Sequence, residues 1–209
     1  RYPQLYGPRQ LLPREWPIVR RVLDKRPFLI VPDGGLTVKS QGWVENAAHA
    51  TLLATDRPHA AIGNIYNVAD SYSLSIRQIA EIIAEELGHN WEIVSLPHEV
   101  ATSTRPLLTS WSSSHRVLDI GPMVRDLGYK DLVTPTEAWR LAARWLAENP
   151  LEPGGMLDKR LQDPFEYETE DRQYEIWREC RERLLSAEWS KQPGFSSAYV
   201  GRVPNPADS

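Results

Sequence analysis

The strand-like segments of this chain are short, few and separated by helices. The apolar run at residues 28–31 is followed by turn-forming residues, and residues 91–94, which end before Pro97, form a second candidate strand. Residues 63–69 form a third candidate strand. A further extended segment is expected at residues 36–44. Between these segments, apolar residues recur at the spacing of helices. Alternating strands and helices predict an α/β fold, but so few strands do not make a complete doubly wound sheet.

Capping signals define two of the predicted helices. Ser75 is a candidate N-cap, Gln78 completes a capping box with it, and Gly88 supplies a C-terminal stop. Thr134, with Pro135 after it, begins a second helix. The remaining predictions are helices at residues 14–26, 45–55, 119–127 and 168–185, and a Ser- and Thr-rich loop at residues 101–114.

The composition of the chain changes after residue 150. Residues 152–155 read Glu-Pro-Gly-Gly, as in a linker, and the segment beyond them is dense in charge. We therefore expect one domain at residues 1–150 and a C-terminal extension, mostly helical, at residues 151–209. The chain starts without a Met, and its first residues read as the end of a strand, so we also expect residues upstream of Arg1.

Charge and cysteine content exclude several classes of function. The formal net charge is -4 and the basic residues are scattered, which does not give the basic patch of a nucleic-acid-binding protein. No run is apolar for the roughly 18 residues that a membrane span needs. Cys180 is the one cysteine, and the five histidines lack the paired spacing of metal ligands. We expect a cytoplasmic protein with no metal and with neither nucleic acid nor membrane as a partner.

Four short motifs follow one another along the first 150 residues. They read RYPQLYGPRQ at residues 1–10, VENAAHA at 44–50, GNIYNVAD at 63–70, and HRVLD at 115–119 with LGY shortly after. In this order and spacing they resemble the extended short-chain dehydrogenases, the NAD(P)-dependent epimerase/dehydratase family. The second motif is similar to the form found in 3β-hydroxysteroid-dehydrogenase-like members. The resemblance covers the C-terminal half of that family only.

The resemblance implies a substrate-binding role for this part of the chain. Gln4 stands where the family has an Asn that faces the substrate, and Lys39 stands where nucleotide-sugar enzymes carry an Arg. Trp43 lies nearby, and Arg116 is a further candidate for contact with an anion. Lys cannot form the bidentate fork of Arg, which argues against a standard nucleotide-sugar substrate. The implied substrate is sugar- or steroid-like, with hydride transfer at a hydroxyl or keto carbon and epimerisation or dehydration as variants.

The resemblance also implies NAD or NADP as cofactor, with Tyr2 and Pro3 beside its nicotinamide end. Dinucleotide binding requires a Gly-rich turn, and the family's chemistry requires Tyr-x-x-x-Lys, but this sequence contains neither. We therefore expect no catalytic residue in this chain, and expect the cofactor to be bound mainly by an N-terminal half of the same protein. The fragment alone is then inactive, and a homodimer is left open.

Two alternatives remain at this point. A non-catalytic binding or partner-docking module could retain the fold without the chemistry. A hydrolase could use the serines at residues 112–114 with His115, although no Gly-x-Ser-x-Gly elbow surrounds them.

Overall fold

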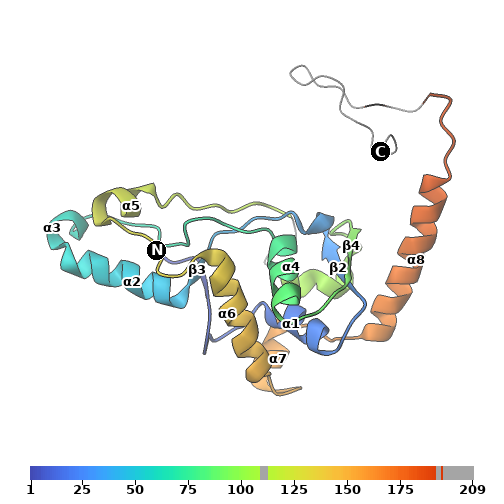
Figure 1. Ribbon diagram of the computed structural model, residues 1–209, viewed down its shortest axis with the longest axis horizontal. Coiled ribbons are helices and arrows are strands. Elements are labelled where there is room, and N and C mark those ends of the chain that lie inside the picture. Colours follow the sequence, from blue (N-terminus) through green and yellow to red (C-terminus); the bar gives the residue numbers. More distant parts are fainter. Residues whose placement is uncertain (109–112, 192–193, 195–209) are drawn as a thin grey trace. The chain divides into compact units, whose positions relative to one another are not determined.

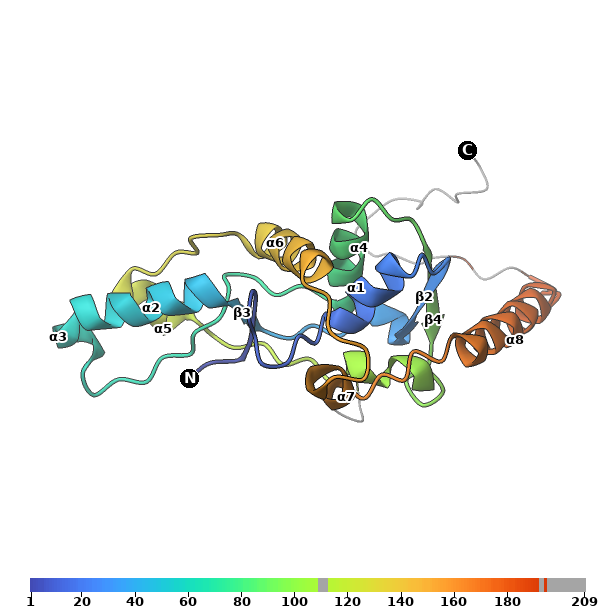
Figure 2. The same cartoon turned by 90° about the horizontal axis from the view of Figure 1, so that it is seen from below.

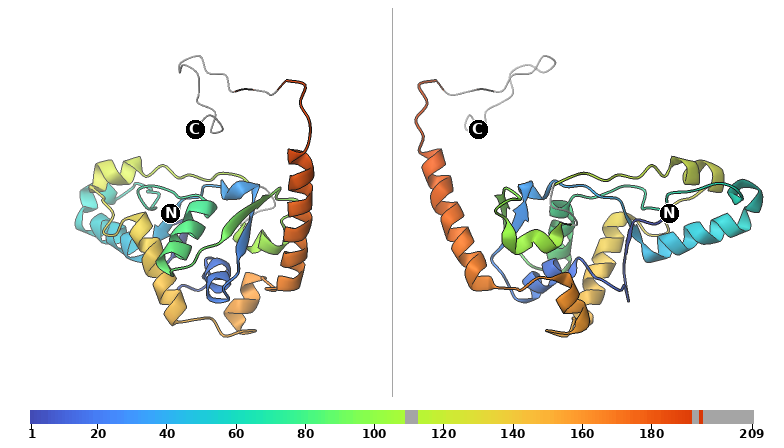
Figure 3. Two further views of the ribbon diagram at one scale, coloured as in Figure 1. Left: turned by 45° about the vertical axis from the view of Figure 1, so that its right-hand side comes forward. Right: turned by 180° about the vertical axis from the view of Figure 1, so that it is seen from behind.

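Two short parallel sheets carry the strands of the chain (Figure 1). In the computed structural model, which describes residues 1–108, 113–191 and 194, β1 (Gln4–Tyr6) pairs with β3 (Gln41–Trp43). The second sheet joins β2 (Phe28–Pro32) to β4 (Glu92–Leu96), which run side by side in Figure 3. Parallel pairs need crossover connections, and helices supply them here. The predicted α/β class is confirmed.

The helices occupy most of the remaining described chain. They are α1 (Trp16–Leu23), α2 (Val44–Asp56), α3 (Pro58–Ala61), α4 (Ile76–Glu86), α5 (Gly121–Leu127), α6 (Pro135–Glu148), α7 (Met156–Leu161) and α8 (Tyr167–Leu185). Two 3-10 helices, η1 (Asp33–Gly35) and η2 (Thr102–Leu107), lie in the connections. No helix among the described residues is long and apolar enough to cross a membrane.

The capping box predicted for α4 is present. The Ser75 hydroxyl accepts a hydrogen bond from the Gln78 backbone N–H at 3.2 Å, and the Gln78 side chain accepts one from the Ser75 N–H at 2.9 Å. Thr134 likewise caps α6 by accepting from the Glu137 N–H at 3.4 Å. These local signals therefore gave both helix starts correctly.

Replacing Ser75 by alanine is expected to destabilise the protein by about 1 kcal/mol, because it removes one partner of the capping box. For a chain of this size, that corresponds to a fall in Tm of about 2–4 °C. Thermal unfolding followed by circular dichroism measures it. Ser95→Ala on the exposed side of β4 is the control; equal Tm values for the two variants would contradict the prediction.

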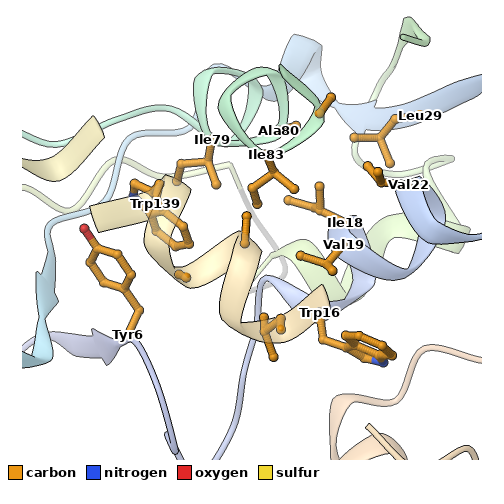
Figure 4. Close-up of a cluster of buried hydrophobic side chains, with 14 of the residues drawn as sticks. Tyr6, Trp16, Ile18, Val19, Val22, Leu29, Ile79, Ala80, Ile83 and Trp139 are labelled. Atoms are coloured by element: carbon orange, nitrogen blue, oxygen red, sulfur yellow. The ribbon is translucent and has the colours of Figure 1, made fainter. Parts of the chain in front are cut away.

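The main hydrophobic core lies where α1, α4 and α6 pack on the sheet of β2 and β4 (Figure 4). Trp139 of α6 stacks on Tyr6 of β1, with ring centroids 4.1 Å apart and planes 10° apart. Tyr6 also meets Trp43 edge to face at 5.6 Å. The aromatic side chains thus connect the β1–β3 sheet to the core around α6.

A second, smaller core joins α2, α3 and α5, which lie together in Figure 2. Its buried members are Ala47, Ala50, Val68, Met123, Leu127 and Tyr129. The small side chains on the buried face of α2 let the neighbouring segments approach closely. This core accounts for the two buried alanines of α2, Ala47 and Ala50.

A buried carboxylate connects three of the sequence motifs. Asp70 accepts hydrogen bonds from the Tyr6 hydroxyl at 2.8 Å, the Trp43 backbone N–H at 2.9 Å and the Asn46 amide at 3.1 Å. Asn46 in turn accepts from the backbone N–H groups of Leu132 and Val133. The network fixes β1, β3 and α2 against the segment that leads into α6.

Several predicted elements differ from the structure. Residues 63–69 are not a strand: Val68 donates to Arg1 and Asp70 donates to Gln41, but these isolated backbone bonds do not build a ladder. The extended segment at 36–44 narrows to β3, preceded by single bridges at Val38 and Lys39. The predicted loop at 101–114 contains η2, and its residues 109–112 lie outside the described chain.

The chain divides into two compact units, Arg1–Tyr174 and Glu175–Ser209. Residues 151–174, expected to belong to the extension, are therefore part of the first unit. Arg21 of α1 explains this, because its guanidinium forms ion pairs with Asp163 at 2.7 Å and with Glu170. All three side chains are buried, so a charged core contact anchors this segment to α1.

Candidate functional site

A small cavity lies between the β1–β3 sheet and the core helices. Its volume is about 50 Å³, several times the roughly 10–15 Å³ that a single water requires. The apolar part of its wall includes Ile18, Ile79 and Trp139, which are labelled in Figure 4. The lining residues are Gln4, Arg14, Glu15, Ile18, Thr37, Lys39, Gln41, Leu74, Ile76, Ile79, Leu107 and Trp139.

Three buried polar atoms on this wall have no hydrogen-bond partner within the described part of the chain. They are Gln4 Nε2, Glu15 Oε2 and Thr37 Oγ1. Glu15 and Thr37 are each only 3% exposed, so bulk water does not solvate them. An unsatisfied buried polar group costs about 1–3 kcal/mol, and buried groups in folded proteins nearly always have partners. Such a concentration in one cavity indicates a place for a polar ligand.

Local structure positions these groups. Gln4 begins β1, Glu15 immediately precedes α1, and Thr37 lies just before the bridge at Val38. The other carboxylate oxygen of Glu15 accepts a hydrogen bond from the Gln10 amide, which fixes the orientation of the side chain. Burial raises the pKa of Glu15 to about 7, so its carboxyl group changes protonation state near neutral pH.

Three cationic side chains gather beside the cavity. Lys39 and Arg116 are partners in a parallel bridge, and Arg14 lines the cavity together with Lys39. Burial, followed by the charges of Arg116 and Arg14, lowers the pKa of Lys39. Mutual repulsion of this kind is relieved when an anion binds.

Arg14 also lines a second, larger cavity of about 780 Å³. Its wall carries Arg105, Arg160, His98 and Glu99 beside apolar residues such as Leu12 and Leu161. This volume lies in the range of small-molecule sites, about 300–1,000 Å³. Because Arg14 belongs to both walls, the small polar cavity and the larger basic cavity are adjacent parts of one candidate site.

The substrate residues expected from the sequence fall into two groups. Gln4 and Lys39 line the small cavity, and the exposed Arg116 stands next to Lys39. Trp43 does not line either cavity: it is 2% exposed, packs on Tyr6 and lies under Gly7. Because core packing accounts for Trp43, we leave it out of the proposed site.

The expected cofactor residues lie immediately before β1 and line neither cavity. Tyr2 is 53% exposed, and its hydroxyl shares a hydrogen bond of 2.6 Å with Thr51 on α2. Pro3 is half-buried and approaches Gly42 of β3. Their contact with a nicotinamide remains a prediction.

The sequence did not reveal Arg14, Glu15 or Thr37. All three lie outside the four motifs, and a charged pair just before a helix is typical of an ordinary solvated helix start. The one usable signal was the position of Arg14 and Glu15 between the first motif and α1. Burial of Glu15 and Thr37 depends on tertiary packing, which periodicity does not report.

The arrangement of Ser113 and His115 does not support hydrolysis. His115 Nδ1 accepts a hydrogen bond from the Val38 N–H at 3.1 Å, and Ser113 donates to Asp33. His98 Nδ1 contacts the same Asp33 carboxylate at 3.0 Å, so the acid lies between the serine and the imidazole. A serine nucleophile needs direct contact with its base, which these bonds do not provide. Ser112 lies outside the described residues.

Comparisons with known proteins show which proteins this chain is similar to. No family model matches the chain. It is 24% identical over 166 residues to the uncharacterized protein YbjS of Escherichia coli, and 31% identical over 84 residues to UDP-D-apiose/UDP-D-xylose synthase 2 of Arabidopsis thaliana. These matches cover 69% and 40% of this chain and 48% and 22% of the relatives.

The fold of the chain is also similar to that of a solved structure. UDP-glucuronic acid 4-epimerase from Bacillus cereus, in complex with UDP-glucuronic acid and NAD, superimposes with a TM-score of 0.55 at 18% identity. The match covers 71% of this chain and 44% of that chain. The chain has the fold of the extended short-chain dehydrogenases. It spans about half the length of the curated relative YbjS and somewhat less of this epimerase.

Two segments of this fold contribute residues to the wall of the small cavity. The first motif supplies β1 and Gln4, and the segment after β2 supplies Thr37 and Lys39. In the described chain, each of the four strands pairs with only one neighbour. The resemblance inferred from the motifs is confirmed at the level of the fold by the superposition on the epimerase.

Proposed function

We propose that this chain is the substrate-binding part of an NAD(P)-dependent epimerase, dehydratase or dehydrogenase that acts on a hydroxyl or keto carbon of a sugar. The observation that carries the proposal is the convergence of Gln4 and Lys39, both expected from the motifs, on one cavity with unsatisfied polar atoms. The fold supports an enzyme of this general kind. The likeness to UDP-sugar synthases supports a sugar substrate.

The residues present do not form a complete dinucleotide site. The Gly34-Gly35 turn follows β2, but a Cβ at Gly35 would lie 2.9 Å from the backbone nitrogen of Arg77. The close approach at this turn is therefore already used by the start of α4. When bound, NAD or NADP supplies the hydride chemistry, and we propose that an N-terminal half of the protein holds it. Tyr2 and Pro3 would only flank its nicotinamide end.

The role of this chain is then to bind and orient. Arg14, Lys39 and Arg116 would contact the anionic group of the substrate, and Gln4 would donate a hydrogen bond to another part of the substrate. Apolar walls of both cavities would exclude water around these contacts. The sequence argued against nucleotide sugars because Lys39 cannot form the bidentate contact of the Arg that those enzymes carry. That argument is weaker now, because three neighbouring cations could take the place of this single Arg.

Arg14→Gln is expected to weaken the binding of UDP to this chain about tenfold, because it removes a charge-assisted contact to the diphosphate. Isothermal titration at two salt concentrations measures the affinity, and the loss should shrink at high salt. Arg125→Gln, at an exposed position of α5, is the matched control. If both variants bind UDP as the native chain does, Arg14 is not part of the site.

A non-catalytic module is the second candidate, because the two cavities and the cations that line them could bind a ligand without a catalytic residue in this chain. Such a module would bind the same ligand without turnover. The reading frame upstream of Arg1 separates the two: a Gly-rich turn with Tyr-x-x-x-Lys there supports the enzyme, and a start codon directly before Arg1 supports the module. The cytoplasmic location and a homodimer remain proposals in either case.

A further inference from the structure

The three unpartnered atoms of the small cavity have complementary hydrogen-bonding characters. Gln4 Nε2 only donates, Glu15 Oε2 accepts when the carboxyl is ionised, and the Thr37 hydroxyl does both. They come from β1, from the residue before α1 and from the segment after η1. Three separate chain segments thus bring donors and acceptors to one cavity whose wall is partly apolar.

A group that satisfies this set must accept a hydrogen bond from Gln4, donate one to Glu15, and either donate to or accept from Thr37. Adjacent hydroxyls of a sugar ring do so, because each hydroxyl is one donor and two acceptor positions. A steroid-like ring would cover the same atoms and leave them unsatisfied, which a site built for hydroxyls rejects strongly, by about 10⁴–10⁵-fold in favourable cases.

We propose that Glu15 and Thr37 are specificity-determining residues that bind the ring hydroxyls of the substrate and restrict the site to polyhydroxylated rings. The inference rests on the proposed function and deepens it, since it names the residues of this chain that would recognise the ring of the substrate. Glu15 is suited to this role because Gln10 holds one carboxylate oxygen and leaves the other, Oε2, for a ligand. Thr37 is suited to it because its hydroxyl has no other partner in the described chain.

The test compares UDP-glucose with UDP, which has the same nucleotide and lacks the ring. Affinities are measured by isothermal titration for the native chain, Glu15→Gln and Thr37→Val. We expect the native chain to bind UDP-glucose at least tenfold more tightly than UDP. Each variant should lose most of this preference while its affinity for UDP stays unchanged. Glu148→Gln and Thr55→Val, both at exposed positions, are the controls and should keep the preference.

Thermal unfolding of the same variants separates binding from structure. Neither atom has a partner to lose, so we expect the variants to keep or raise the native Tm while the preference for the ring falls. A variant whose Tm falls but whose preference is unchanged has a structural role, and the inference is then wrong. If UDP binds but native and variant chains show the same ratio, the inference fails and the proposed function stands. If neither ligand binds to the native chain, both fail.

Discussion

Replacement of Arg21 by methionine is expected to lower the free energy of unfolding by about 3–5 kcal/mol, the largest effect of any single change considered for this protein. The Arg21 side chain is 1% exposed, and those of Asp163 and Glu170 are 1% and 4% exposed. Methionine fills a similar volume but leaves two carboxylates buried without a counter-charge. The penalty comes from these uncompensated charges more than from the lost ion pairs.

Urea denaturation of the native and variant chains measures this loss. Arg20→Met on the same helix is the control, because Arg20 is 25% exposed and its pair with Asp24 is expected to contribute at most about 1 kcal/mol. The triple variant Arg21→Met, Asp163→Asn, Glu170→Gln removes all three charges and should recover much of the stability. A triple variant as unstable as Arg21→Met alone would show that the buried charges are not the cause.

Glu15→Gln is expected to stabilise the protein at pH 8 by about 3 kcal/mol and to have little effect near pH 4. Burial raises the pKa of Glu15 from 4.5 to about 7 in the folded chain. As pH rises from 4.5 to 7, the unfolded chain releases this proton while the folded chain retains it. Folding stability therefore falls across this window, and each pKa unit corresponds to about 1.4 kcal/mol. Glutamine has no such proton, so the variant avoids the loss.

Chemical denaturation at several pH values between 4 and 8 tests this prediction. The stabilities of native chain and variant should separate progressively through the window and stay apart above it. Glu148→Gln, at an exposed site, should follow the native curve. Parallel curves for native chain and Glu15→Gln would mean that Glu15 titrates at its ordinary pKa. Together with the binding test, the result would show whether Glu15 lowers folding stability while it contributes to substrate binding.

The sequence predicted elements whose determinants are local. Both capped helices begin where Ser75 and Thr134 indicate, because a cap is formed by residues within one turn. The prediction of a strand at residues 63–69 was wrong, because a strand requires a neighbouring strand to which it is hydrogen-bonded along its length. No local pattern specifies such a neighbour. Residues 151–174 were assigned to an extension because the linker-like composition gave no sign of the distant ion pairs with Arg21.

The candidate site was predictable only where a motif carried it. Gln4 and Lys39, which line the small cavity, were expected in a substrate site because the first motif and the segment before α2 resemble a known family. Trp43 came from the same comparison, but its side chain packs in the core. Glu15 and Thr37 were missed because their significance is tertiary: they are polar residues that the fold buries without partners.

The Asp70 and Asn46 network has a consequence for how likeness among such proteins is interpreted. These two residues stand inside the most recognisable motifs, yet their hydrogen bonds hold backbone segments together and reach neither cavity wall. When two proteins carry the same residues at positions 46 and 70, this therefore indicates that they share a scaffold. Proteins that agree there are free to differ at positions 15 and 37, and so to diverge in the molecules they accept.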